Sequence, residues 1–367
     1  MENVITYVGL DVHKKMIVVA MLVPGAAAPV RWECPNERER VRRTLKRIRR
    51  EAAGTVQMCY EAGPCGYALQ RQVAEFDSSM KCVVVAPSLI PRKPGERIKT
   101  DKRDALKLAE YLRSGLLTEV RPPTPEEEAA RDLCRAREDV SEDLRRSQHR
   151  LSKFLLRRDV VFTRGKKAWT RSHRLWLNGL KFDDACAQSV FDDYLLAVEQ
   201  IEARLLGLQI RLTELSQKEP YAEPVGRLRC FRGIDTITAM TIVVELYAFG
   251  RFRSARGLMA FLGLVPGEHT SSDKVRRTGI TRTGNGHVRR LLIESAWHYR
   301  HRAVPGAALK KRRLGQPAQA IAIADKAMLR LNRRYTRMVA RGKSSALTVT
   351  AVARELAGFI WATLRVA

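Results

Sequence analysis

The sequence is short of acidic residues. Its 367 residues hold 39 Asp and Glu against 67 Lys and Arg, a formal net charge of +28 at pH 7. Such an excess attracts polyanions at long range, so nucleic acid is the leading expected partner and an anionic membrane surface the weaker one. An apolar content of 45% is enough to build a core in each of two or three domains, which excludes wholesale disorder.

Cysteine is scarce and is poorly spaced for metal binding. The seven cysteines include no CxxC pair and no tight cluster with histidine, which excludes a zinc module of ordinary spacing. An odd number of cysteines also argues against a disulfide framework. We therefore expect free, mostly buried thiols and a cytoplasmic protein.

Long apolar runs are nearly absent. The run 16–23 follows two lysines as in a signal peptide, but it is short and acids precede it, so we predict a β-strand there. The stretch 346–367 carries Arg354 and Glu355 in its middle. This predicts an amphipathic helix rather than a membrane span.

The first 120 residues alternate predicted strands and helices. Their order is β-β-β-α-β-α-β-α, which predicts an α/β domain with a mixed sheet flanked by helices, the RNase H-like or RuvC-like layout. Three prolines within 121–125 then end this domain, because proline cannot continue a helix. The predicted strands are 4–11, 16–22, 30–32, 55–60 and 81–86, and the predicted helices are 37–50, 66–76 and 101–112.

The rest of the chain is predicted to be all-α. Two leucine-rich stripes in 126–218 follow heptad spacing and predict central coiled-coil helices, either as a pair within one chain or as an oligomeric coiled coil. We expect a compact, glycine-containing domain at 221–300 and a basic helical extension at 301–367. Residues 281–367 hold 18 Lys or Arg and three acids, so more than half of the net charge lies there.

Four carboxylates lie at predicted strand and helix ends. Asp11 ends the first strand, Glu61 ends a later one, and Asp101 and Asp104 start a helix, where three-residue spacing places them on one face. In an RNase H-like sheet these positions converge. Hard carboxylate oxygens favour Mg²⁺ or Mn²⁺, and a pair of such ions suits phosphodiester cleavage. Singly, each acid also fits a helix cap, a turn or a solvated surface.

Other candidate residues have equally plain alternatives. His13 fits a metal ligand or a base, but a turn histidine with a structural hydrogen bond is favoured. The run from Gly233 to Thr236 is similar to a helix-hairpin-helix that holds a backbone phosphate, although Asp235 replaces a glycine and an ordinary turn remains open. The segment 266–286 combines serines with arginines, which suits phosphate chemistry, but its composition alone favours a solvated loop.

Taken together, these motifs resemble the DEDD transposases of the insertion-sequence family numbered one-ten, which are bridge-RNA-guided serine recombinases. The similarity runs in order from about residue 5 to 300. It is specific in combination, because an acidic RuvC-like set is joined to a distinctive downstream segment. The motifs are Tyr7 to Lys14, Tyr60 to Gly63, Lys99 to Ala105, Gly233-Ile234, Ser254 to Arg256, Ala260 to Pro266, Gly284-Asn285 and Arg289 to Leu292.

The resemblance implies roles for these residues. Asp11, Glu61, Asp101 and Asp104 would bind Mg²⁺, and Ser271, five residues after Pro266, would form a phosphoserine link to DNA. Ser272 is the neighbouring alternative. The implied partners are element-end and target DNA, a guide RNA and further copies of the chain in a homodimer or homotetramer, at the nucleoid of a bacterial or archaeal cell.

Two rival functions remain open. A RuvC-like, metal-dependent and structure-selective nuclease would need the acids but no serine link. A non-catalytic nucleic-acid-binding protein would use the acids only as structural groups. The basic clusters Lys310 to Arg313 and Arg333-Arg334 are expected to contact nucleic-acid backbones, and a solvated basic helix is their alternative.

Overall fold

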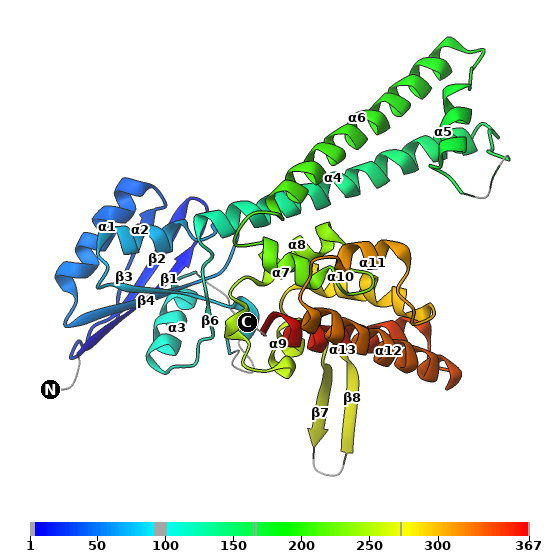
Figure 1. The fold of residues 1–367 in the computed structure, drawn as a ribbon. Coiled ribbons are helices and arrows are strands. Elements are labelled where there is room, and N and C mark those ends of the chain that lie inside the picture. Colours follow the sequence, from blue (N-terminus) through cyan, green and yellow to red (C-terminus); the bar gives the residue numbers. More distant parts are fainter. Residues whose placement is uncertain (1–3, 92–100, 164, 166, 272–273, 366–367) are drawn as a thin grey trace. The chain divides into compact units, whose positions relative to one another are not determined.

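The computed structural model describes residues 4–365 apart from 92–100, 164, 166 and 272–273. The chain forms two compact units, Met1–Pro123 and Thr124–Ala367. The first unit holds a mixed sheet, and the second is largely helical (Figure 1). Both features were predicted from the sequence.

The first unit contains a six-stranded sheet in the order β3-β2-β1-β4-β5-β6. β1 pairs parallel with β4 and β4 with β5, whereas the other neighbours are antiparallel. The predicted element order is confirmed, and the structure adds the two-residue edge strand β6. The elements are β1 (Ile5–Val12), β2 (Met16–Leu22), β3 (Val30–Pro35), α1 (Arg38–Glu51), β4 (Thr55–Glu61), α2 (Ala68–Phe76), β5 (Lys81–Val85), η1 (Pro87–Leu89), α3 (Asp101–Arg113) and β6 (Glu119–Val120).

Helices cover both faces of this sheet. Alternate strand residues such as Leu10 and Tyr60 pack in one apolar cluster with α1 and α2. The intervening positions, including Cys59, pack with Leu108 of α3 in another cluster. Successive strand side chains point to opposite faces, so the register fixes which residues face α3.

The second unit begins with two long helices that lie side by side (Figure 1). They are α4 (Pro125–Leu156) and α6 (Ala185–Leu215), with the short α5 (Arg171–Asn178) at their far end. Thr124 caps α4 through a reciprocal capping box with Glu127, and Pro125 occupies the first turn. The predicted stripes supply buried contacts such as Leu151 and Val198. The chain therefore forms a helical pair by itself, and an oligomeric role stays a prediction.

The remaining helices apart from α11 share one apolar core, which also includes residues from the first turns of α4. Residues from both sides of position 300 pack into this one core. The boundary between a domain at 221–300 and an extension at 301–367 stays a prediction from the sequence. The elements are α7 (Ala222–Leu228), α8 (Thr236–Leu246), η2 (Phe249–Arg251), α9 (Ala255–Phe261), β7 (Pro266–Ser271), β8 (Lys274–Ile280), α10 (Gly286–Ala296), η3 (Trp297–Arg300), α11 (Ala307–Arg313), α12 (Ala318–Ala340) and α13 (Ser345–Arg365).

α13 is the helix, within the described part of the chain, that is long and apolar enough to cross a membrane by length and composition. A core helix passes the same test. Val352, Leu356 and Ile360 of α13 are buried in the core of the second unit, and the helix also carries Arg354 and Glu355. The apolar residues of α13 are therefore explained by its packing in the core of the second unit.

The segment 266–280 forms an antiparallel β-hairpin where the composition favoured a solvated loop. β7 pairs with β8 from Pro266–Ile280 to Ser271–Lys274. Thr270, Val275 and Thr278 are β-branched and suit extended backbone, which explains the strands. Ser271 is the last residue of β7, its side chain is not described, and Ser272 lies outside the described residues.

Candidate active site

The candidate site is built on a close approach of α3 to β1. A Cβ atom on Gly9 would overlap the carbonyl oxygen of Ala105 and lie 2.6 Å from the amide nitrogen of Ala109. Only glycine allows the helix backbone to pack this tightly against the strand. The approach brings the first turn of α3 beside the end of β1, where Asp11 lies two residues after Gly9.

Three ligand-type side chains converge at this point. His13 Nε2 lies 3.3 Å from Asp11 Oδ2 and 3.6 Å from Asp101 Oδ2. One ligand atom from each of the three residues lies within 4.8 Å of the other two. Asp11 is the most enclosed, with 21% of its side chain exposed, against 54% for His13 and 59% for Asp101. The cluster is thus open to solvent on one side.

The electrostatics of the cluster suit a cation. Burial raises the pKa of the Asp11 carboxyl above its ordinary value; His13 opposes this shift, and the carboxylates of Asp101 and Asp104 add to it. Like charges held together in a partly buried place repel one another unless a cation lies between them. Two carboxylates and an imidazole are also a chemically suitable donor set for a divalent ion.

The two remaining predicted acids lie nearby in the fold. Leu10 of β1 pairs with Tyr60 of β4, so Glu61 occupies the next register position, beside Asp11 at the ends of two parallel strands. Cys59 faces α3, and its thiol donates to the carbonyl oxygen of Leu108. Glu61, two residues later, is therefore directed to the same face. Asp104 is half-buried in the first turn of α3.

His13 belongs to this cluster more closely than the sequence indicated. It was favoured as a turn histidine, and its backbone amide does donate to Met16 O across the β1–β2 turn. Its side chain nevertheless lies between two carboxylates that are 90 residues apart in sequence. The spacing Asp11-Val12-His13 places both side chains on one face of the strand, and this was the available signal.

We expect Gly9→Ala to disrupt the site. The added methyl must displace α3, which should cost about 1–3 kcal/mol of stability and move Asp101 away from Asp11. A shift of this kind should reduce any activity that depends on the cluster by about 10²-fold. Gly207→Ala is the matched control, because a Cβ there meets nothing within 4 Å. An unchanged melting temperature and unchanged activity in Gly9→Ala would contradict this account of the α3 packing.

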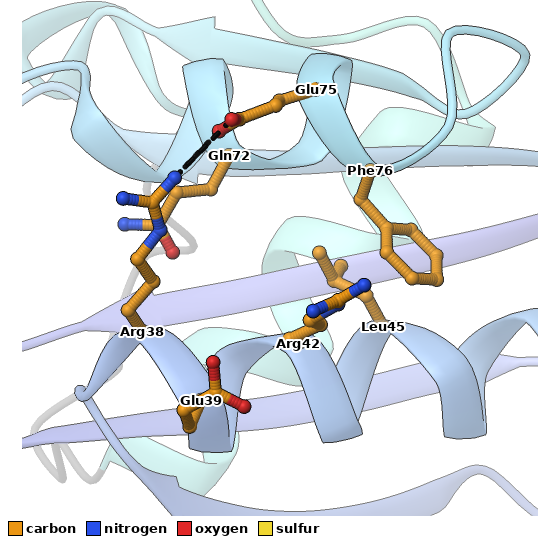
Figure 2. Close-up of a pocket in the computed structure, with 7 residues that line it drawn as sticks. All are labelled: Arg38, Glu39, Arg42, Leu45, Gln72, Glu75 and Phe76. Carbon is orange, nitrogen blue, oxygen red and sulfur yellow. Dashed lines mark hydrogen bonds and ion pairs between the residues drawn. The ribbon is translucent and has the colours of Figure 1, made fainter.

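A separate groove lies on the opposite face of the sheet. It has a volume of about 370 Å³ and is lined by side chains of α1 and α2 (Figure 2). Arg38 reaches across it to Glu75 at 3.2 Å, as the dashed line in Figure 2 shows. Its two arginines are matched by two glutamates, Glu39 and Glu75. This charge-balanced groove lacks the convergence of acids seen beside α3 and is not part of the candidate site.

In the second unit, a buried ion pair supports the start of α10. Glu245 is 3% exposed and accepts two hydrogen bonds from Arg135, at 2.7 and 3.1 Å, and one from Asn285 Nδ2 at 2.7 Å. Burial alone would raise the pKa of Glu245, but these hydrogen bonds outweigh it and hold the pKa below its ordinary value. Asn285 also caps α10, and it follows the β7–β8 hairpin closely. The network therefore fixes α10, which follows the hairpin, relative to α4.

The predicted hairpin around Gly233 contains a capped helix start. Gly233 has φ +80°, and Asp235 accepts a hydrogen bond from the backbone amide of Thr238 at 2.8 Å. Aspartate at this position thus serves as the N-cap of α8. The residue that replaces the expected glycine already occupies part of the helix terminus that a phosphate would use.

A basic face follows α12. Lys326, Arg330, Arg333, Arg337 and Arg341 recur at three- or four-residue spacing, which places them on one side of the helix. They border a groove of about 710 Å³ that also contains Arg334, Lys343 and Glu355. The single glutamate pairs with Arg330 and Arg334. The groove thus keeps a strong positive excess.

One residue of the predicted basic clusters has a structural role instead. Arg313 is 8% exposed, donates to the carbonyl oxygen of Cys230 and pairs with Asp325 at 2.7 Å. It anchors α11 and is not available to a nucleic acid. The sequence did not distinguish it from Lys310, Lys311 and Arg312, because only tertiary packing separates them.

Comparison with known proteins explains why these parts occur together. Residues 8–158 match a DEDD transposase family, and residues 226–311 match the transposase IS116/IS110/IS902 family. The chain is 41% identical to the transposase named y4qE of Sinorhizobium fredii, over 98% of this chain and 88% of that protein. It is 36% identical to the transposase for insertion sequence element IS1533 of Leptospira borgpetersenii, over 92% and 97% of the two chains.

These matches cover both units, and the DEDD match includes the strand and helix that carry the acidic cluster. A DEDD nuclease domain implies use of a divalent metal, in agreement with the donor set at Asp11, His13 and Asp101. The chain therefore belongs to the IS110 family of transposases, enzymes that act on the DNA of a mobile element.

Proposed function

We propose that this transposase cuts and rejoins DNA strands at the ends of its element and at a target, guided by a bridge-type RNA. Asp11, Glu61, Asp101 and Asp104 bind Mg²⁺ or Mn²⁺, and Ser271 is the nucleophile. The observation that carries the proposal is the convergence of Asp11, His13 and Asp101 where β1 meets α3. It occurs in a chain whose family moves DNA.

The acids have distinct roles in this proposal. When bound, the metal polarises the scissile phosphate and stabilises the charge that develops on the leaving oxygen. Asp11, which is more enclosed than Asp101, provides the fixed position for binding. Asp101 and Asp104 join it from α3, and Glu61 joins it from β4. His13 hydrogen-bonds to Asp11 and orients that carboxylate.

The covalent step conserves bond energy. The Ser271 hydroxyl attacks a DNA phosphorus and gives up its proton, a serine–phosphate ester bond forms, and the strand's phosphorus–oxygen bond breaks. The leaving oxygen takes up a proton and becomes a hydroxyl end. Attack by a second strand's hydroxyl on the same phosphorus reverses these changes and rejoins DNA without a high-energy cofactor.

RNA guidance would assign sequence choice to base pairing and leave shape and phosphates to the protein. The basic face of α12 supports this division, because its regularly spaced cations suit contacts to backbone phosphates. We propose that dimers or tetramers assemble the synapse through the α4–α6 pair. The exposed residues Leu206 and Ile210 of α6 provide apolar surface for such contacts. The proposed setting is the nucleoid of a bacterial or archaeal cell.

Sequencing the RNA that co-purifies with the full chain tests the guidance proposal. We expect one small RNA that derives from the non-coding flank of the element. Asp11→Asn is the control, because it should lose strand cleavage and keep the same RNA. A random mixture of cellular RNA with both proteins would overturn RNA guidance.

A further inference from the structure

A second basic cavity lies in the helical unit, apart from the α12 groove. It has a volume of about 730 Å³, is open to solvent, and is lined by the turn before α8, by η3 with the chain that follows it, and by α11. Its ionisable lining residues are Arg232, Asp235, His298, His301, Arg302 and Arg312.

The charges of this cavity are unbalanced. Three guanidinium groups line it, of Arg232, Arg302 and Arg312, against one carboxylate among the described residues, that of Asp235. In the groove of Figure 2, by contrast, two arginines face two glutamates. Like charges gathered in a cavity without matching acids are typical of a site that receives an anion.

The excess of cations affects the pKa of the Arg312 guanidinium. Burial lowers its pKa, and the neighbouring Arg229 and Arg313 lower it further against the opposing effect of Asp235. Its Nε is buried and has no hydrogen-bond partner among the described residues. Because this Nε is shielded from solvent, an anion in the cavity would have to contact the terminal amino groups of the Arg312 guanidinium.

The cavity is also held in shape. Arg232 donates to the carbonyl oxygens of His298 and Val304, which ties the α8 turn to the segment after η3. A Cβ on Gly233 would lie 2.5 Å from the carbonyl oxygen of Ser295, so this turn packs closely on α10. Arg313 fixes α11 through Asp325. The cationic groups therefore stand on braced elements.

We propose that this cavity binds a phosphodiester group of a nucleic-acid backbone through the side chains of Arg302, Arg312 and His301. The Asp235 carboxylate caps α8 and takes up the amide of Thr238, so side chains rather than hairpin amides hold the phosphate. Planar guanidinium groups match phosphate oxygens in pairs. This proposal depends on the proposed function in one respect, that the bound anion is part of a nucleic acid. It does not depend on the covalent step at Ser271.

Arg302→Gln tests the proposal, since Arg302 is exposed and its replacement removes one charge from the cavity. We expect the affinity of the full chain for a short labelled DNA duplex, or for an RNA of unrelated sequence, to fall about tenfold. The slope of log Kd against log salt should fall by about one, as for one lost phosphate contact. Whichever of the two probes loses affinity identifies the source of the phosphate.

Arg204→Gln is the matched control, an exposed arginine on α6. It should keep wild-type affinity and slope. Modification of arginines by phenylglyoxal, read by mass spectrometry, should show protection of Arg302 by the bound probe and none of Arg204. Equal losses in the two variants, or equal modification of Arg302 with and without both probes, would overturn the pocket. Asp11→Asn should bind normally, so failure of the pocket and failure of the catalytic proposal give different results.

Discussion

Asp11→Asn is expected to reduce DNA strand cleavage at least about 10³-fold, because the proposed mechanism assigns this enclosed carboxylate as a ligand of the catalytic metal. The amide keeps the size of the side chain but supplies no negative charge. Cleavage of labelled element-end DNA in Mg²⁺, measured under single-turnover conditions, gives this ratio directly.

The fold should survive this substitution. Burial and the neighbouring acids raise the pKa of Asp11 against the opposing effect of His13, so the ionised carboxylate lowers the folding stability of the metal-free protein. Removal of the charge should leave the melting temperature without metal equal or higher. Glu39→Gln, an exposed change on α1, is the control and should keep cleavage at the wild-type rate. Wild-type cleavage by Asp11→Asn would contradict the catalytic role.

Ser271→Ala is expected to abolish the covalent protein–DNA adduct, because no hydroxyl remains to form the phosphate ester. Trapping the full chain on a nicked element-end substrate, followed by denaturing electrophoresis, measures the adduct. Strand rejoining should be lost with it, whereas binding of the DNA should persist.

Ser272→Ala is the matched control for this experiment. It should retain the adduct if Ser271 at the end of β7 is the nucleophile. Loss of the adduct in Ser272→Ala and its retention in Ser271→Ala would instead identify Ser272 as the nucleophile. An adduct that survives in both single variants and in the double variant would defeat the serine mechanism and favour a RuvC-like nuclease that uses water.

The sheet and its acids were predictable because their signals are local. Apolar β-branched runs end at Asp11 and Glu61, and the structure places these two strands side by side, in parallel. The first turn of α3 likewise begins at Asp101, as predicted. Strand ends and helix starts depend on neighbouring residues, so one sequence is enough to locate them.

Features that depend on tertiary packing were not predictable. The contact between Gly9 and Ala105 joins residues far apart in sequence, and nothing near Gly9 indicates which helix will approach it. The same holds for Arg313, which resembles the exposed Lys310 and Lys311 in sequence but is buried beside Cys230. The β7–β8 hairpin was missed for another reason, since its polar composition concealed a β-branched pattern.

The capped turn at Asp235 changes the interpretation of a motif. A glycine there would have left the amides of α8 free for phosphate, whereas the aspartate accepts from Thr238. The departure from the expected hairpin sequence therefore has a structural cause. It moves the expected phosphate contact from the backbone of this turn to the arginines around it.

The most direct test of the central claim is to locate the metal. Crystals of the full chain soaked in Mn²⁺ and measured for anomalous scattering should show a peak about 2.0–2.2 Å from carboxylate oxygens of Asp11 and Asp101. Crystals of Asp11→Asn under the same conditions should lack that peak. An absence of anomalous density at this cluster in the wild-type crystals, at saturating Mn²⁺, would contradict the account.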